Sequence, residues 1–196
     1  MKTHHIFCLI GKSASGKDTI YQELLGDASL RLHRIVPYTT RPVREGEVNG
    51  REYFFTDIPG YEKMEKEGRV IEHRVYPSVY GPWYYFTADD GQIDLSRGNF
   101  LMIGTLESFR AMRDYFGEDV VIPLYIHVED GERLTRALQR EKQQDQPRYT
   151  EMCRRFLADA EDFSDRKIEE AGIRHIFDNT GLSDCMDEIR EYIRRQ

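Results

Sequence analysis

A glycine-rich segment near the N-terminus has the spacing of a phosphate-binding loop. It reads GKSASGKDT, with four residues between its two glycines and a lysine directly after the second. Glycines let the backbone turn its N–H groups toward phosphate oxygens, and the start of a helix and a lysine add positive charge. This pattern predicts a site for the phosphates of ATP, formed by Gly11, Lys12, Ser13, Ala14, Ser15, Gly16, Lys17, Asp18 and Thr19.

Asp18 stands where phosphate loops of this type carry a serine or threonine whose hydroxyl binds Mg²⁺. A carboxylate is a stronger ligand than a hydroxyl for this hard cation, although it also places negative charge beside the phosphates. We therefore expect Asp18 to hold the Mg²⁺ that accompanies ATP, with Thr19 sharing this role.

Residues 39–55 read TTRPVREGEVNGREYFF and carry a second set of phosphate-binding side chains. Arg41 and Arg44 lie three positions apart in a loop rich in glycine and proline, and Tyr53 adds a hydroxyl donor. Forked guanidinium groups bind the oxygens of one phosphate in pairs. The segment is therefore suited to the phosphate of a small acceptor molecule.

Residues 39–55 also closely resemble the signature of the guanylate kinase family, at every position that the signature constrains. The resemblance implies phosphoryl transfer from Mg·ATP to a nucleoside monophosphate, most simply GMP. It implies that Glu72 accepts hydrogen bonds from the guanine N1–H and amino group. It further implies that Tyr80 and Gly81 help to bind the acceptor phosphate.

The resemblance is weaker in the second half of the chain. Arg136 and Arg140 match a pair of arginines at the entrance of the family's lid, and Arg155 approximates a third. Arginines four residues apart share one face of a helix and can neutralise the charge on a transferring phosphoryl group. Asn179 resembles an asparagine that the family places beside adenine.

The sequence departs from the family pattern where the acceptor base is read. Prolines stand at two positions expected to be serine, Pro37 and Pro82. Gly104 and Leu106 stand at two positions expected to be aspartate. A site that has lost several hydrogen-bond partners discriminates less well between substrates, so the specificity for the base is left open.

Two alternatives remain open beside a nucleotide acceptor. The ribose 1,5-bisphosphate phosphokinases resemble guanylate kinases, and they share the GKD of the phosphate loop, a small turn like Ile103-Gly104-Thr105 and the QIDL segment at residues 92–95. The second alternative is a non-catalytic module that binds phosphopeptides. Such modules generally lose the phosphate loop, which this chain retains.

The chain must form elements that hold these residues in place. Short apolar runs at residues 4–10, 99–104, 120–128 and 173–177 predict buried strands. Helical spacing of apolar residues over 17–25 and 182–193 predicts helices between and after them. Strands that alternate with helices favour an α/β fold with a largely parallel sheet.

The resemblance implies that this fold is a P-loop kinase made of one domain in three parts. We expect a core formed by about residues 1–36, 87–135 and 156–196. The aromatic-rich residues 37–86 form a small acceptor-binding subdomain with its own strands, and residues 136–155 form a lid. Pro147 should interrupt the helical stretch of the lid.

Composition excludes other classes of function. The chain has 196 residues, a formal net charge of −7 and a pI near 5.4, so it should repel nucleic-acid backbones. It contains no run approaching the roughly 18 apolar residues of a membrane helix and no signal-peptide pattern, so we expect a cytoplasmic protein. The three cysteines form no CxxC pair and the six histidines show no metal-binding spacing.

Overall fold

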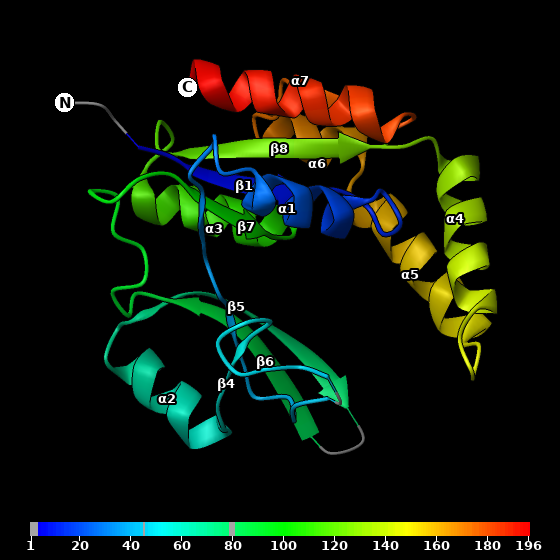
Figure 1. Cartoon of the computed structure of the whole chain (residues 1–196). Helices are drawn as coiled ribbons and strands as arrows, with labels where there is room; N and C mark the ends of the chain where they lie inside the picture. Colours follow the sequence, from blue (N-terminus) through cyan, green and yellow to red (C-terminus); the bar gives the residue numbers. More distant parts are fainter. Residues whose placement is uncertain (1–3, 45, 79–80) are drawn as a thin grey trace.

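The strands of the protein divide between two sheets, which form the upper and lower parts of the molecule in Figure 1. The computed structural model describes residues 4–44, 46–78 and 81–196. The larger sheet has five strands, all parallel. In spatial order they are β2 (His33–Arg34), β7 (Phe100–Ile103), β1 (Ile6–Ile10), β8 (Val121–His127) and β9 (Ile176–Asp178). The predicted α/β fold with a central parallel sheet is confirmed.

Strand β1 lies in the middle of the larger sheet, and all five of its residues are buried. Alternate side chains of a strand point to opposite faces, so β1 contributes to two cores. Its even-numbered residues pack with α3, and its odd-numbered residues pack with α1 and α7. These helices are α1 (Lys17–Gly26), α3 (Leu106–Phe116) and α7 (Leu182–Arg195). Burial on both faces explains why the sequence of β1 is an unbroken apolar run.

The smaller sheet is built around the antiparallel hairpin of β5 (Val70–Ser78) and β6 (Gly81–Ala88). Two short strands, β3 (Tyr38–Thr39) and β4 (Phe54–Phe55), extend it beyond β6. Helix α2 (Ile58–Lys66) packs on one face through Tyr61, which contacts the rings of Tyr84 and Phe86. This helix was not predicted, because its apolar residues are too few to mark a helical period.

The opposite face of the smaller sheet carries mostly polar and aromatic side chains. Registers across the sheet place Arg74 opposite Tyr85, and Glu72 opposite Thr87, on this side. We call it the polar face; its strand residues are Thr39, Glu72, Arg74, Tyr76, Trp83, Tyr85 and Thr87. The alternation of a strand separates these residues from the ones that pack on α2.

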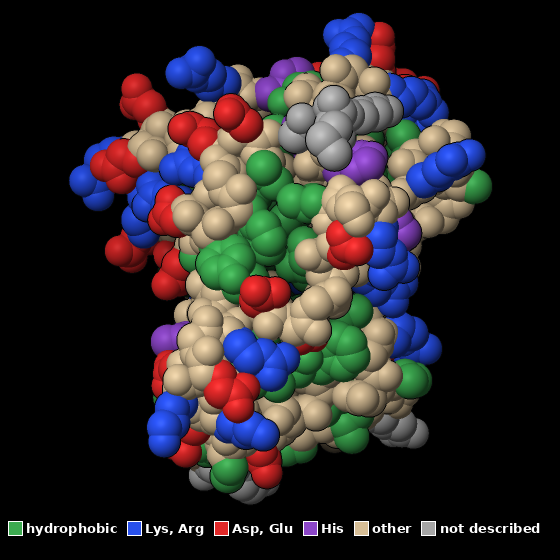
Figure 2. All heavy atoms as spheres, turned by 90° about the vertical axis from the view of Figure 1, so that its left-hand side faces the viewer, with side chains coloured by type: hydrophobic (Ala, Val, Ile, Leu, Met, Phe, Trp, Pro, Cys, Tyr) green, Lys and Arg blue, Asp and Glu red, His purple; other side chains and the backbone are tan. Residues whose placement is uncertain are grey.

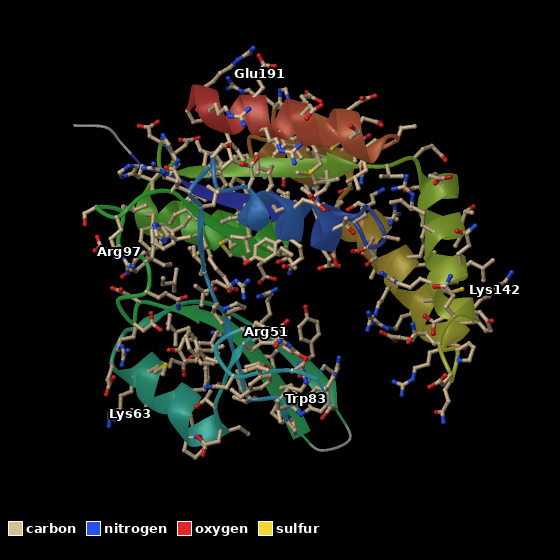
Figure 3. All side chains as sticks on the ribbon, in the orientation of Figure 1. Arg51, Lys63, Trp83, Arg97, Lys142 and Glu191 are labelled. Atoms are coloured by element: carbon tan, nitrogen blue, oxygen red, sulfur yellow. The ribbon has the colours of Figure 1, made fainter. Side chains whose placement is uncertain are left out.

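Helices α4 (Asp130–Lys142) and α5 (Tyr149–Asp162) pack on each other and project beside the larger sheet, at the right of Figure 1. Pro147 lies in the turn between them, as predicted. Trp83 of β6 and Lys142 at the end of α4 mark the two outlying parts of the molecule in Figure 3. The short helix α6 (Asp165–Glu170) then leads back to β9.

The two sheets are joined beside α3. The Tyr115 hydroxyl on α3 donates a hydrogen bond to Asp89, just beyond β6, at 2.9 Å. On this side of the molecule hydrophobic side chains reach the surface at the junction (Figure 2). Cys8, Cys153 and Cys185 are free thiols. In the described part of the chain we find no helix with the length and apolar character needed to cross a membrane.

Candidate active site

The phosphate loop begins where β1 ends, and its shape depends on two glycines. Gly11 has a φ of +152°, and a Cβ there would overlap the carbonyl oxygen of Ile126 in β8. Gly16 has a φ of +88°, and a Cβ there would overlap the amide nitrogen of Asn179. Ala14 also has a positive φ, of +61°. Both glycines are therefore needed for close approach as well as for backbone conformation.

Arg133 and Asp159 hold the outer side of the phosphate loop. The Arg133 guanidinium donates to the Ser13 carbonyl at 2.8 Å, and the Asp159 carboxylate accepts from the Ser13 N–H at 2.7 Å. Arg133 also pairs with Asp159 at 3.3 Å and with Asp130 at 2.9 Å. Its side chain is only 1% exposed. No sequence motif marks Arg133 or Asp159. The one sequence signal that could have identified Arg133 is its position about one helical turn before Arg136.

Lys17 lies inside the loop, where its ammonium donates to the Lys12 carbonyl at 2.9 Å. Burial lowers the pKa of Lys17, whereas the carboxylates of Asp18 and Asp159 raise it. The positive charge of Arg140 lowers this pKa further, which places that arginine within electrostatic reach of Lys17. Arg140, one of the two predicted lid arginines, thus acts on Lys17 electrostatically.

Asp18 and Thr19 lie exposed in the first turn of α1, directly after Lys17. Together they offer one carboxylate and one hydroxyl beside the phosphate loop. Mg²⁺ keeps several water ligands and takes only one or two from a protein when phosphates supply the rest. This donor set therefore fits Mg²⁺ bound together with a nucleotide. Among the described residues there is no cluster of three or more acidic, histidine or cysteine side chains that could hold a metal unaided.

Asn179 lies beneath the phosphate loop and is only 3% exposed. Its side-chain amide donates to the Ser15 carbonyl at 2.8 Å, and its backbone N–H donates to His127 at the end of β8. It therefore contacts the loop directly. The amide thus braces the loop, which the family resemblance did not imply.

The other lid arginines are engaged in local ion pairs. Arg136 pairs with Glu132 at 2.9 Å. It also donates to the backbone carbonyl of Asn179, the residue that holds the phosphate loop, at 3.1 Å. Arg155 is 61% exposed and pairs with Glu151 on the same helix. Arg136 is therefore close to the loop, while the contact of Arg155 is within α5.

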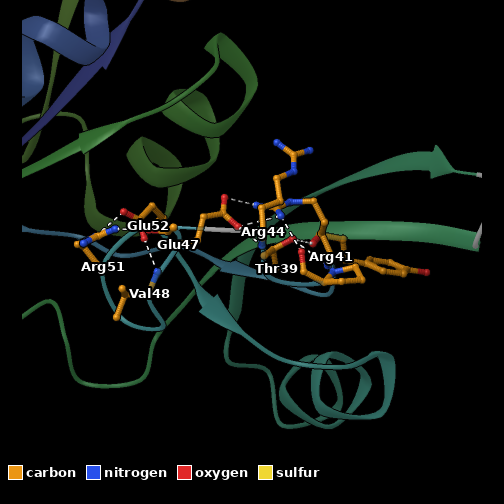
Figure 4. A network of polar contacts seen from close by, with 10 residues as sticks. Thr39, Arg41, Arg44, Glu47, Val48, Arg51 and Glu52 are labelled. Atoms are coloured by element: carbon orange, nitrogen blue, oxygen red, sulfur yellow. Dashed lines mark hydrogen bonds and ion pairs between the residues drawn. The ribbon is translucent and has the colours of Figure 1, made fainter. Parts of the chain in front are cut away.

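The acceptor signature is organised by Glu47, as Figure 4 shows. Its carboxylate binds the Arg41 guanidinium at two points, 2.7 and 3.0 Å, and accepts from the Arg44 N–H at 2.7 Å. Arg41 is almost fully buried, and its Nε has no hydrogen-bond partner. Arg44 is exposed. Sequence reasoning gave Glu47 no role, although it is one of the constrained positions of the signature.

Tyr53 extends this cluster to the polar face. The Arg41 guanidinium lies 5.6 Å from the Tyr53 ring, and the ring of Tyr53 meets that of Tyr85 edge-on at 5.7 Å. Burial raises the pKa of the Tyr53 phenol, and Tyr85 raises it further, while Arg41 and Arg74 oppose this shift. The hydroxyl is therefore a proton donor at neutral pH, suited to an anion.

Glu72 lies near the start of β5, which continues for six more residues to Ser78. Its side chain is 4% exposed. The carboxylate accepts from the Thr87 hydroxyl at 2.8 Å and pairs with Arg74 at 3.2 Å. Gly81 begins β6 with a φ of +104°, and the predicted Tyr80 lies outside the described residues.

The two positions without the expected aspartates have definite local structure. Thr105 caps α3, and its hydroxyl and the Ser108 side chain exchange hydrogen bonds with each other's backbone. Leu106 therefore begins the helix and is buried in the core under β1. A Cβ on Gly104 would lie 2.5 Å from the Ser108 hydroxyl and 3.1 Å from the Cys8 sulfur. No side chain fits at position 104 without displacing these groups.

Comparisons with known proteins agree on one family. The model of the family described as guanylate kinase matches residues 3–89. The guanylate kinase of Porphyromonas gingivalis is 27% identical over 187 residues, covering 92% of each chain. That of Wolbachia pipientis is 26% identical over 97% of this chain and 90% of its own. The crystal structure of the guanylate kinase from Anaplasma phagocytophilum matches the fold with a TM-score of 0.68, at 19% identity over 98% of this chain and 86% of its own. These comparisons show that the chain is similar to guanylate kinases along most of its length, with the family model matching its N-terminal part.

Proposed function

We propose that this protein transfers the terminal phosphoryl group of ATP to the phosphate of GMP, giving ADP and GDP. One observation carries this proposal: the buried Arg41 lies against the half-buried Tyr53, whose ring meets Tyr85 on the sheet that carries Glu72. Ile71, next to Glu72, packs against the core cluster that contains Cys8 of β1. This arrangement supports a donor site and an acceptor site on either side of the same core.

The donor site has the parts needed to position ATP. The backbone amides of the loop and the Lys17 ammonium bind the phosphates, and Asp18 and Thr19 would hold the Mg²⁺ that travels with ATP. Bound Mg²⁺ supplies charge neutralisation at the phosphate oxygens. Arg133 and Asp159 fix the loop, and Arg140 adds positive charge where negative charge spreads in the transition state.

At the acceptor site, Arg41, Arg44 and Tyr53 bind the phosphate, and Tyr80 and Gly81 are assigned to the same phosphate by the family resemblance. Glu47 holds the Arg41 guanidinium before substrate arrives, so little side-chain entropy is lost on binding. Alignment of the two phosphates supplies most of the catalysis, because phosphoryl transfer of this type needs no nucleophilic side chain.

We also propose the division of labour among the three parts of the chain. Residues 37–86 bind the acceptor, residues 136–155 close as a lid, and the remainder carries the donor site. Closure brings Arg136 and Arg140 nearer the transferring group and excludes water.

The proposal is tested by measuring ADP release with ATP and a panel of acceptors: GMP, dGMP, AMP, UMP and ribose 1,5-bisphosphate. We expect the highest kcat/KM with GMP and dGMP. Turnover of ribose 1,5-bisphosphate alone would instead support the sugar-phosphate alternative. Binding of a phosphopeptide without turnover of any acceptor would support the non-catalytic alternative.

Lys17→Met should abolish turnover, by a factor on the order of 1,000, without changing the fold, because the ammonium is needed at the phosphates. The matched control is Lys63→Met in α2, whose side chain is 75% exposed. Circular dichroism and ADP release would be measured for both variants. Normal activity in Lys17→Met would refute the assigned donor site.

A further inference from the structure

Arg74 is the charged neighbour of the glutamate on the polar face. Its Nε donates to one carboxylate oxygen of Glu72 at 3.2 Å and its Nη2 lies 3.4 Å from the other. The third guanidinium nitrogen, Nη1, makes neither of these two contacts with Glu72. Arg74 is 18% exposed where Glu72 is 4% exposed, so the arginine is the more accessible member.

The pair lies between the acceptor cluster and the larger sheet. Burial raises the pKa of Cys8 in β1, the Glu72 carboxylate raises it further, and Arg74 opposes the shift. Arg74 also acts electrostatically on Tyr53. Arg74 lies opposite Tyr85 across the sheet, and the ring of Tyr85 meets that of Tyr53 at 5.7 Å. The pair therefore stands one side chain away from the residues assigned to the acceptor phosphate, where the attached base would lie.

At four positions the chain lacks the side-chain hydrogen-bonding groups expected from the family pattern. Pro37 and Pro82 have neither a side-chain hydroxyl nor a backbone N–H to donate. Gly104 has no side chain and no room for one, and Leu106 faces the core. On β5 and β6, the charged residues of the polar face are Glu72 and Arg74.

The hydrogen-bond donors of Arg74 and the acceptors of Glu72 lie side by side, and this order matches the edge of guanine that carries O6, N1–H and the amino group. Guanine presents an acceptor, O6, next to donors at N1–H and the amino group. An arginine has donors only and an ionised glutamate acceptors only. Adenine presents the reverse order, an amino donor beside an acceptor nitrogen, and would place like groups against each other.

We propose that Arg74 is a specificity-determining residue, which donates to O6 of the acceptor base while Glu72 accepts from N1–H and the amino group. The inference rests on the proposed GMP kinase activity. Arg74 takes the role of the hydroxyl donors that Pro37 and Pro82 cannot supply. Glu72 then recognises guanine as part of an ion pair with Arg74. In the family pattern, by contrast, the glutamate would act together with aspartates at the positions of Gly104 and Leu106.

The test compares kcat/KM for GMP, IMP and 6-thio-GMP in Arg74→Met, Arg74→Lys and the wild type. IMP lacks the amino group, and 6-thio-GMP has sulfur, a weak acceptor, in place of O6. We expect Arg74→Met to lower kcat/KM for GMP and IMP equally, by roughly 10- to 100-fold, and to affect 6-thio-GMP much less. Arg74→Lys should recover part of the loss.

A structural role for Arg74 would lower kcat/KM equally for all three acceptors, and that result would overturn the proposal. Unchanged preference for GMP over 6-thio-GMP in Arg74→Met would overturn it as well. The matched control is Arg69→Met, just before β5, whose side chain is 39% exposed and pairs with Glu67. Urea unfolding of each variant checks the fold. Absence of GMP turnover in the wild type would refute the proposed function itself, a result distinct from the others.

Discussion

At the scale of the residue, the phosphate loop depends on glycines that are close to other atoms. Gly16 combines a left-handed backbone with contact against the Asn179 amide, and that amide in turn holds the Ser15 carbonyl. An added methyl group would push against the residue that braces the loop. The position of the loop amides therefore depends on the absence of a side chain at one residue.

Gly16→Ala should destabilise the protein by about 1–3 kcal/mol, since a non-glycine residue in this conformation is strained. It should also lower kcat/KM for ATP, on the order of 100-fold, because the loop amides move away from the phosphates. Urea unfolding and initial rates would measure both effects.

The matched control is Gly26→Ala at the other end of α1. A Cβ there meets no atom within 4 Å, and the backbone is not left-handed. We expect unchanged or slightly raised stability, because alanine favours a helix over glycine. Equal behaviour of the two variants would contradict the role given to Gly16.

At the scale of the element, helices α4 and α5 clamp the phosphate loop through Arg133. This side chain contributes hydrogen bonds to Ser13, Asp130 and Asp159, and its guanidinium lies 4.6 Å from the Phe156 ring. The contact joins the base of the proposed lid to the donor site. Movement of α5 is therefore coupled to the loop.

Arg133→Met should lower the free energy of unfolding by on the order of 3 kcal/mol, because it leaves the largely buried Asp159 without its partner. The KM for ATP should rise as well, since the Ser13 carbonyl and N–H lose their fixed positions. Arg154→Met, on the exposed side of α5, removes a solvent-screened ion pair that contributes little to stability and serves as the control. A normal KM for ATP in Arg133→Met would show that the clamp does not act on the donor site.

At the scale of the whole molecule, stability at low pH depends on carboxylates whose pKa values are lowered by hydrogen bonds. Arg41 lowers the pKa of Glu47, Ser29 lowers that of Asp27, and Arg154 lowers that of Glu151 to about 2. Such groups bind fewer protons when folded than when unfolded. Their contribution is complete above the unfolded values of 3.8 to 4.5 and is lost as pH falls through the folded values.

We therefore expect the urea midpoint to be nearly constant from about pH 8 to pH 5 and to fall steadily below about pH 4.5. Glu47→Gln should start from a lower midpoint and lose less on acidification, because this carboxylate no longer titrates. A midpoint that rises toward pH 3 would contradict the assignment of these ion pairs.

The sequence was sufficient to predict features that depend on local pattern. The apolar runs identified strands of the larger sheet, since burial on both faces leaves no polar positions in β1. The two segments that we propose to bind phosphate were recognisable because glycine and arginine spacing is dictated by phosphate geometry.

Features that depend on long-range packing were not predictable in this way. Arg133 and Asp159 lie 26 residues apart and meet Ser13 only after α4 and α5 have folded back. The burial of Asn179 beneath the loop depends on β9 pairing with β8. The pairing of Glu72 with Arg74 depends on the register of β5 and β6, which includes a bulge between Val70 and Glu72.

The position of β1 has a consequence for the order in which the molecule opens. A strand hydrogen-bonded on both edges and buried on both faces is exposed only by global unfolding, so its amide protons should be among the slowest to exchange with deuterium. The smaller sheet has its own apolar cluster and can open as a separate unit. The donor site, attached to the end of β1, would then keep its shape while the acceptor site opens and closes in the native ensemble.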